Sequence, residues 1–424
     1  MSGYSKLACA GVLAGALVSG VVASETPPSL TEPLCPGTGS GSQPCDAPLL
    51  AIREDTFDRM VSGELERVAI HVLGDEVVFE RVAATRRHQT STWYGVEHPL
   101  KASIIVTLGR GHLRAEIVRN GTRVVLEPTR TPFVVQSRMI DPNVKADGIA
   151  CEVEPASPPK TLPPPECGPY TPDSGSIIDV MILVTQGLAD RNPGPLLQTL
   201  IQSLIDFANV AYISSGIQTQ LRLVHVEVVD YPDDSPGDMA EALQDLIANA
   251  GVFSNVEELR TEYGADQVTL LRDYVDEGCG KARLIRDPNA AGAYAVVQEG
   301  EKGQYVCGRL VLAHEIGHNL GCMHDRSNSS FPGRFEDSYG FQQQDHFFTL
   351  MAYPNGCGSC VSIPNFSNPN VEYEGVPTGI ALPDPESANC ARTINIARRD
   401  MACYRRTRIP FPPRHATGRA WLLP

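Results

Sequence analysis

The chain has 424 residues, of which 50 are acidic and 35 are basic, and its formal net charge is -15. This length is sufficient for two domains, each with its own hydrophobic core. The acidic balance, together with the absence of a Lys/Arg cluster in the body of the sequence, argues against nucleic acid as a partner.

The first 24 residues have the features of a secretory signal. Lys6 gives a weakly positive start, Leu7 to Val22 is apolar and rich in small residues, and Val22-Ala23-Ser24 offers a small-residue cleavage site. The alternative, a membrane anchor, is disfavoured because the run is short, contains Gly and Ser, and lacks a basic flank. No later segment is expected to span a bilayer. We therefore expect a secreted or periplasmic protein with no stable membrane anchor after signal cleavage.

Residues 25–154 are expected to form a β-rich region. After a loose lead-in rich in Pro and Gly, β-branched runs at 67–73, 92–96 and 102–108 predict strands. Residues 155–175 are rich in proline and cannot build a core, so an extended linker is expected there. This linker is the best candidate for a domain boundary.

Residues 176–405 alternate between strand-like and helix-like segments. Apolar, β-branched runs predict strands, and a 3.6-residue periodicity predicts helices. The predicted strands are 180–184, 220–229, 267–271 and 292–297, and the predicted helices are 196–211, 239–248 and 255–263. The alternation predicts an α+β domain with a mixed, mostly parallel twisted sheet and helices packed against it. Residues 406–424 carry arginines and prolines and are interpreted as a basic disordered tail.

The chain has twelve cysteines, and eleven remain once Cys9 is lost with the signal. An exported protein meets an oxidising compartment, so disulfides are expected. Cys35 and Cys45 bracket a short loop and are expected to pair locally. Cys357 and Cys360 are interpreted as ordinary half-cystines, because no βαβ context supports a redox motif. The remaining connectivity and the identity of the one unpaired thiol stay open.

Residues 314–325 read His-Glu-Ile-Gly-His-Asn-Leu-Gly-Cys-Met-His-Asp. On a helix, His314 and His318 project from the same side, which is the geometry that two zinc ligands need. Gly321 can adopt a positive φ, so that the helix ends and the chain brings His324 to the same ion. Three nitrogen ligands leave a fourth position for water, as in catalytic zinc sites. The length of the motif disfavours a chance match on an ordinary helix.

Residues 348–354 read Phe-Thr-Leu-Met-Ala-Tyr-Pro. Together with the long histidine motif, this segment resembles the metzincin metalloproteases, which have a methionine-containing turn beneath the zinc. Asp325 after the third histidine resembles the reprolysin (adamalysin) group, whereas Tyr353 two places after Met351 is more like the astacins and serralysins. The wider region looks most like bacterial reprolysin-like secreted proteases, among them the peptidyl-Asp metalloendopeptidases. The resemblance covers the C-terminal half of the chain.

The resemblance and the motif together suggest a role for each residue near the metal. Glu315 lies next to the first ligand and is predicted to be the general base, which takes a proton from the attacking water and passes it to the leaving amine. Zinc activates that water and stabilises the developing oxyanion. Met351 would pack beneath the imidazoles without binding zinc, and Asp325 would orient the surroundings of the third ligand. Tyr353 either contributes its hydroxyl to the oxyanion or only packs in the turn.

The resemblance also implies a zincin-like fold for residues 176–405 and a removable pro-region at 25–154, so that the protein is made as a zymogen. The 292–297 strand would be the antiparallel edge above the active site, where an extended substrate could pair; an ordinary hairpin strand is the alternative. The substrate-contacting residues would then be Gly292, Ala293, Tyr294 and Ala295. A preference for the N-terminal side of Asp would need a nearby cation. Arg392 is the first candidate, and a solvated surface arginine is its alternative interpretation.

The predicted function is a secreted zinc endopeptidase that acts as a monomer on protein or peptide substrates. The alternatives are a catalytically idle secreted module that keeps a zinc fold for binding, and a zinc hydrolase that acts on something other than protein. An intact Glu315 argues against the idle module, since a structural zinc site has no use for that carboxylate. The unpaired cysteine either ligates zinc from the pro-region, as the resemblance to metzincin zymogens suggests, or is a free buried thiol or a mobile cysteine that is lost with the pro-segment. Calcium would suit an extracellular protease, but no calcium-loop motif supports it.

Overall fold

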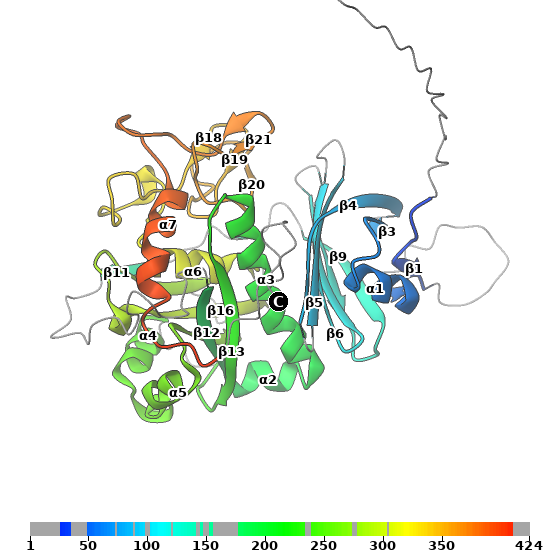
Figure 1. Cartoon of the computed structure of the whole chain (residues 1–424), viewed down its shortest axis with the longest axis horizontal. Coiled ribbons are helices and arrows are strands. Elements are labelled where there is room, and N and C mark those ends of the chain that lie inside the picture. Colours follow the sequence, from blue (N-terminus) through cyan, green and yellow to red (C-terminus); the bar gives the residue numbers. More distant parts are fainter. Residues whose placement is uncertain are drawn as a thin grey trace, which may run out of the picture.

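The computed structural model of the chain contains an N-terminal antiparallel sheet and a C-terminal α+β part (Figure 1). It describes residues 26–34, 49–72, 74–87, 90–97, 102–119, 122–140, 145–146, 152–155, 177–233, 239–273, 278–302 and 305–409. The expected signal segment, the Cys35–Cys45 pair, residues 156–175 of the expected linker and the tail from residue 410 onward lie outside the described residues.

The N-terminal sheet has nine antiparallel strands in the order β1-β2-β9-β8-β7-β6-β5-β4-β3. The strands are β1 (Thr31–Pro33), β2 (Leu49–Ile52), β3 (Arg67–Val72), β4 (Asp75–Arg86), β5 (Thr90–Glu97), β6 (Ala102–Gly109), β7 (His112–Arg119), β8 (Thr122–Pro128) and β9 (Val134–Ile140). The strands predicted at 67–73, 92–96 and 102–108 are confirmed as β3, β5 and β6. The short helix α1 (Glu54–Val61), which buries Met60, was not predicted.

The C-terminal part is built on a second sheet in the order β10-β17-β16-β14-β12-β13, to which β15 and β11 are added. Its strands are β10 (Lys145–Ala146), β11 (Glu152–Pro155), β12 (Ile177–Thr185), β13 (Gln220–Val229), β14 (Gln267–Asp273), β15 (Gly280–Leu284), β16 (Tyr294–Lys302) and β17 (Tyr305–Cys307). Neighbours among β13, β12, β14 and β16 are parallel. The expected α+β class with a mixed, mostly parallel sheet is therefore confirmed.

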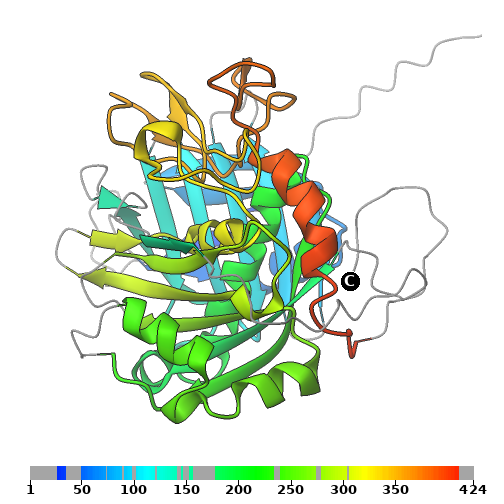
Figure 2. The same ribbon diagram turned by 90° about the vertical axis from the view of Figure 1, so that its left-hand side faces the viewer.

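Six helices accompany this sheet in the described part of the chain. They are α2 (Gln186–Arg191), α3 (Pro195–Ser214), α4 (Met239–Ala248), α5 (Val256–Tyr263), α6 (Val311–Asn319) and α7 (Cys390–Met401). Helix α3 lies between the two sheets, so that it is covered on both sides (Figures 1 and 2). Contrary to expectation, α3 is long and apolar enough to pass for a membrane span. Its burial between two sheets accounts for that composition.

The 292–297 strand is not the edge of the sheet, and this prediction was wrong. Strand β16 pairs in parallel with β14 on one side and antiparallel with β15 on the other. The antiparallel strand is β15, which was not predicted from the sequence. Its five residues, Gly-Lys-Ala-Arg-Leu, include no β-branched or aromatic side chain, so the local pattern gave no strand signal.

After α6 the chain forms only short strands before α7, as expected, although α7 itself was not predicted. These strands are β18 (Gln342–Gln343), β19 (Phe347–Phe348), β20 (Val361–Ser362), β21 (Glu372–Tyr373) and β22 (Val376–Pro377). Cys357 and Cys360 form a disulfide with each other, which confirms that they are half-cystines. A second disulfide joins Cys279 to Cys307. Two described cysteines, Cys322 and Cys390, are free and buried.

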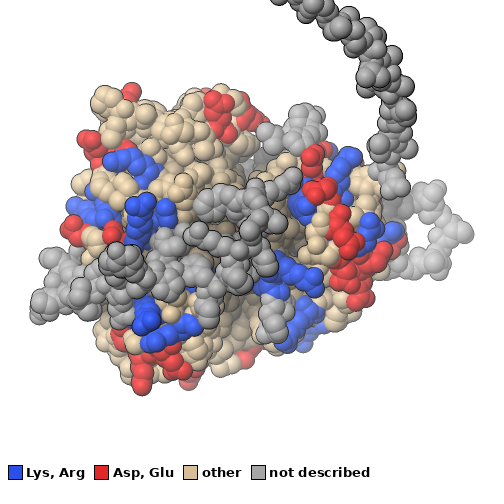
Figure 3. Space-filling model, in the orientation of Figure 1, with Lys and Arg blue, Asp and Glu red and all other residues tan. Residues whose placement is uncertain are grey.

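On the face of the molecule in Figure 3, acidic and basic side chains are interspersed. No extended basic field is visible among the described residues of this face.

Candidate metal centre

Helix α6 carries the first two histidines of the motif, as the sequence predicts. His314 and His318 lie one turn apart on α6, and both are buried. The helix ends at Asn319, and Gly321 follows with a φ of 94°. This left-handed conformation favours glycine, and it turns the chain so that His324 returns to the other two imidazoles. The predicted route that brings His324 to the other two imidazoles is confirmed.

The three imidazoles converge on one point. The Nε2 atom of His324 lies 3.1 Å from Nε2 of His318 and 3.2 Å from Nε2 of His314. The potential ligand atoms of the three residues all lie within 4.8 Å of one another. Three ring nitrogens facing one another at this spacing fit the ligand set of a tetrahedral zinc site with one open position.

The outer ring nitrogens of the first two histidines are held by backbone carbonyls. Nδ1 of His314 lies 2.8 Å from the carbonyl oxygen of Leu350, and Nδ1 of His318 lies 2.8 Å from that of Cys322. Because a carbonyl only accepts, each Nδ1 carries the proton and each Nε2 presents a lone pair toward the shared point. This arrangement of the outer nitrogen is typical of metal-binding histidines.

Burial keeps the imidazoles neutral. It lowers the pKa of His314 to about 4 and that of His324 to about 3, and it lowers the pKa of His318 as well. The neighbouring imidazoles lower the pKa of His318 and His324 further. Neutral imidazole is the form that binds a metal ion. The donor set, its protonation and its convergence therefore all fit zinc.

Met351 lies beneath the helix at the expected place. It is fully buried, and a methyl group added to Gly317 would lie 2.7 Å from its sulfur. Gly317 is the residue before His318, so the thioether packs against the underside of the helix between the two ligands. The carbonyl of Leu350, which precedes Met351, accepts the hydrogen bond from His314. The turn thus both packs under the helix and orients the first ligand.

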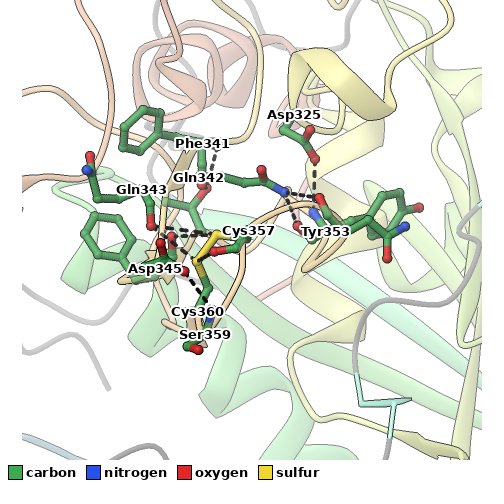
Figure 4. The surroundings of a disulfide bond; sticks show 12 residues. Asp325, Phe341, Gln342, Gln343, Asp345, Tyr353, Cys357, Ser359 and Cys360 are labelled. Carbon is green, nitrogen blue, oxygen red and sulfur yellow. Dashed lines mark hydrogen bonds between the residues drawn. A yellow bond between two sulfur atoms is a disulfide. The ribbon is translucent and has the colours of Figure 1, made fainter.

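Asp325 connects the end of the motif to the methionine turn. Its carboxylate accepts the backbone N–H of Tyr353 at 3.0 Å, as Figure 4 shows. It also accepts hydrogen bonds from Ser327 and from the side-chain amide of Asn328. The hydroxyl of Tyr353 lies 3.0 Å from Nε2 of His324. Tyr353 therefore reaches the point where the imidazoles meet, a contact that packing alone does not require.

Glu315 and Asn319 face the strands that lie over α6. Glu315 has no exposed surface and lies against the first residue of β15. The side-chain amide of Asn319 donates to the backbone carbonyls of Arg283 in β15, at 2.8 Å, and Tyr294 in β16, at 3.2 Å. No role for Asn319 was predicted from the sequence. The position of Asn319 within the histidine motif could have indicated a role, but its hydrogen-bond acceptors lie on strands that are distant in the sequence.

The proposed substrate-contacting residues 292–295 do not lie on the sheet edge. Ala293, Tyr294 and Ala295 are buried between β14 and β15. The Tyr294 hydroxyl donates a hydrogen bond to the carboxylate of Glu257, on the side of the sheet that carries α5. An interior strand has no unpaired backbone groups to offer a peptide. The neighbour of β16 on the side of α6 is β15.

Arg392 has a partner within the fold. It lies on α7, donates to the carboxylate of Asp337 at 2.8 Å, and lies over the ring of Phe335. Its charge is thus already balanced, which favours the alternative interpretation of a structural surface arginine. A role for Arg392 in substrate binding stays a prediction.

The outer side of β15 is occupied by the chain itself. Strand β11 pairs with β15 in parallel, with Glu152 opposite Lys281 and Pro155 opposite Leu284. Strand β11 belongs to the segment between the N-terminal sheet and β12. An extended peptide could use this edge only after β11 had left it.

The N-terminal sheet is docked on α3 by a buried carboxylate. Asp206 of α3 accepts hydrogen bonds from Thr92 at 2.5 Å and Thr107 at 2.8 Å, and Arg87 lies 3.0 Å away. All three partners come from the N-terminal region. An apolar cluster surrounds this contact, and it consists of Ile105, Phe207, Val210, Tyr94 and Leu310.

A second polar contact reaches the start of the histidine helix. Arg309, two residues before α6, is buried and lies 3.8 Å from the carboxylates of both Glu116 in β7 and Glu127 in β8. The N-terminal sheet is therefore tied both to α3 and to the segment that leads into α6.

Residues 174–367 match a reprolysin model described as metallo-peptidase family M12. This range contains β12 to β20, α2 to α6 and all three histidines. It covers the C-terminal sheet apart from β10 and β11, and it excludes the N-terminal sheet.

Three curated bacterial proteins are similar to about half of the chain, and each carries the name peptidyl-Asp metalloendopeptidase. The protein from Pseudomonas aeruginosa is 30% identical over 257 residues, which are 55% of this chain and 41% of the relative. Those from Xanthomonas campestris and Stenotrophomonas maltophilia are 28% and 26% identical and cover 55% and 54% of this chain. The match spans about half the length of these relatives, at 41% to 52%.

Among solved structures, metalloproteinase-II from Bacteroides fragilis is similar with a TM-score of 0.45 and 14% identity, over 72% of this chain and 90% of that one. A chaperone–substrate complex gives a TM-score of 0.43 over 80% of this chain.

Proposed function

We propose that the chain is a zinc-dependent endopeptidase that hydrolyses protein substrates, because residues 174–367 match a reprolysin model described as metallo-peptidase family M12. The observation that carries the proposal is the convergence of His314, His318 and His324, with Glu315 next to His314 on α6. A buried site made only to stabilise the fold would have no use for an adjacent carboxylate. The catalytic domain is proposed to be a metzincin, comprising residues 176–405.

His314, His318 and His324 would hold the zinc ion through Nε2. A bound zinc ion supplies Lewis-acid activation of the attacking water and of the scissile carbonyl. Glu315 accepts the proton of the water during attack and then delivers it to the departing amine. The Tyr353 hydroxyl, next to the imidazole of His324, donates to the oxygen that becomes negative. Burial of the whole group excludes bulk water and strengthens these interactions.

The substrate is proposed to bind as an extended strand along β15. Once β11 departs, β15 would be the edge of the sheet above α6, and its outer backbone groups would be available. Along β15, main-chain hydrogen bonds would hold a peptide of any sequence, and pockets for its side chains would add specificity. Protein and peptide substrates suit such an edge better than small molecules do.

The N-terminal region 25–154 is proposed to be an inhibitory pro-region, with 155–175 as the segment that is cleaved. Two observations support this. Strand β11 occupies the edge of β15, and the N-terminal sheet is docked on α3 and Arg309. N-terminal sequencing of the active enzyme should find a start between about 140 and 180, allowing for uncertain boundaries. Full activity in a chain that still begins near residue 25 would contradict it.

The protein is proposed to act outside the cytoplasm. Disulfides at Cys279–Cys307 and Cys357–Cys360 support an oxidising compartment. The N-terminal apolar segment supports export. A monomer is proposed because no partner is needed to complete the site among the described residues.

The similar bacterial proteins suggest a preference for bonds at Asp, and this preference is proposed for the present chain. A desolvated carboxylate needs a charged partner, and Arg392 already pairs with Asp337. Mass-spectrometric mapping of cleavage sites in a denatured protein tests the preference directly. Cuts enriched before Asp are expected, whereas cuts spread before Leu, Phe and Ile would reject it and leave a general endopeptidase.

The primary test is hydrolysis of casein at neutral pH. We expect cleavage by the processed enzyme, loss of cleavage with a chelator, and recovery when zinc is added back. A protein that binds zinc yet leaves casein intact would instead support the catalytically idle binding module.

A further inference from the structure

The first residue of β15 lies directly against the carboxylate of Glu315. A β-carbon added to Gly280 would lie 2.3 Å from Oε1 of Glu315 and 2.6 Å from both Cδ and Cγ. Real β-carbons essentially never come closer than 3.0 Å to another heavy atom. The φ of Gly280 lies outside the left-handed region, so an alanine could adopt this backbone. Glycine is needed at this position because a side chain would collide with Glu315, and not because of its backbone conformation.

Helix α6 cannot move away from β15 to make room. Gly317 lies two residues after Glu315, so it faces the opposite side of the helix. A β-carbon there would lie 2.7 Å from the sulfur of Met351 and 3.1 Å from the ring of Phe366. The helix is therefore held between β15 above and the methionine turn below, with a glycine at each contact.

Strand β15 cannot move away either. The Cys279–Cys307 disulfide joins the residue before Gly280 to a residue four positions ahead of α6. The carbonyl of Cys279 also accepts the backbone N–H of Gln298 at 2.8 Å. Further along the strand, the carbonyl of Arg283 accepts a hydrogen bond from Asn319. Both ends of β15 are thus fastened to α6 or to the segment that leads into it.

We propose that Gly280 is a positioning residue for Glu315. Because Gly280 has no side chain, the carboxylate of Glu315 can lie directly against its backbone. The Cys279–Cys307 disulfide fixes this backbone relative to α6. A methyl group at this position would displace the carboxylate and leave helix, strand and histidines in place. This inference rests on the proposed role of Glu315 as the general base.

The test compares Gly280→Ala with Gly187→Ala. Gly187 lies in α2, its φ is also outside the left-handed region, and its added methyl group would meet the end of the Asp233 side chain. The full chains carry a C-terminal tag and are co-secreted with untagged wild-type chain, which supplies any processing. Zinc content, kcat and KM are measured on the purified tagged enzymes. Crystal structures of the full-length variants give the position of Glu315 independently of activity.

For Gly280→Ala we expect zinc content and KM near wild type, a fall in kcat of about 10²-fold, as for a misplaced reacting group, and a carboxylate displaced in the crystal structure. Gly187→Ala should match wild type. In a Glu315→Asp background, whose side chain is one methylene shorter, Gly280→Ala should cost less than about tenfold, because interacting residues are not additive.

Three results would overturn the proposal: an unmoved carboxylate, a loss of zinc from Gly280→Ala, or an equally large fall in kcat in the Glu315→Asp background. If the wild-type and Gly187→Ala enzymes both fail to cleave casein, the proposed function fails. The crystallographic position of Glu315 in Gly280→Ala still decides the positioning role in that case.

Discussion

The carboxylate of Asp325 accepts the backbone N–H of Tyr353 at 3.0 Å, across a sequence separation of 28 residues (Figure 4). This single hydrogen bond joins the residue after the third histidine to the turn that lies beneath the metal centre. It couples the position of His324 to that of the methionine turn, because Asp325 directly follows His324 and Tyr353 lies in the turn.

Asp325→Ala should weaken zinc binding without unfolding the domain. The substitution removes the acceptor of Tyr353 N–H and leaves His324 less constrained. Loss of such an outer contact typically lowers metal affinity by about 10–100-fold. Competition with a zinc-binding dye measures the affinity. Asp345→Ala is the matched control, since Asp345 accepts the backbone N–H of Ser359 in the same loop region. Equal affinities in the two variants would contradict the coupling.

Tyr353→Phe should lower kcat and leave zinc content unchanged. The hydroxyl lies 3.0 Å from Nε2 of His324, next to the place where the scissile carbonyl would bind. Loss of one donor to a developing oxyanion costs about 10²–10³-fold in kcat. Steady-state kinetics on a fluorogenic peptide provide the measurement. An unchanged kcat would assign Tyr353 to packing alone.

Met351→Leu should leave most of the activity. The thioether packs against Gly317 and is fully buried, and leucine has nearly the same volume. A volume-conserving exchange of this kind usually costs less than about 1.5 kcal/mol. Thermal unfolding and zinc analysis are the measurements. Complete loss of zinc would mean that the sulfur has a role beyond filling space.

Asp206→Ala should loosen the N-terminal sheet. The carboxylate is buried and serves Thr92, Thr107 and Arg87 together, so its removal leaves these groups without a shared acceptor. Breaking a buried pair by removing one partner costs about 3–5 kcal/mol. A protease site inserted within residues 156–176 is cut, and the fragments are analysed by gel filtration. Wild-type fragments should co-elute and Asp206→Ala fragments should separate.

The exposed Asp190 provides the control for this experiment, since Asp190→Ala should behave like wild type. Immediate separation of the wild-type fragments would show that the sheet is held only by the covalent link.

The sequence predicted features that depend on local geometry. The spacing of His314 and His318, the turn at Gly321 and the return of His324 follow from helix periodicity and from the freedom of glycine, and all three are confirmed. Strand β13 and helix α4 were predicted with the bounds that the structure has. Apolar periodicity is uninterrupted in α4 and changes phase once in β13, after Leu223, and turn residues mark the ends of both elements.

Features that depend on long-range pairing were not predicted. Strand β15 has a weak local signal, so the edge was assigned to β16, whose stronger apolar pattern reflects burial on both sides. The contact of Gly280 with Glu315 is equally invisible in the sequence, because it depends on how β15 lies over α6. The docking of Asp206 on Thr92 and Thr107 joins residues about a hundred positions apart, and periodicity carries no information at that range.

Glu315 is proposed to perform chemistry at a zinc ion held by the three histidines. Zinc content and casein hydrolysis, measured side by side in Glu315→Ala and His314→Ala, test it most directly. Glu315→Ala should keep about one zinc ion per chain while hydrolysis falls by at least about 10²-fold. His314→Ala should lose both zinc and activity. Hydrolysis by Glu315→Ala within about tenfold of wild type, or full retention of zinc by His314→Ala, would contradict the account.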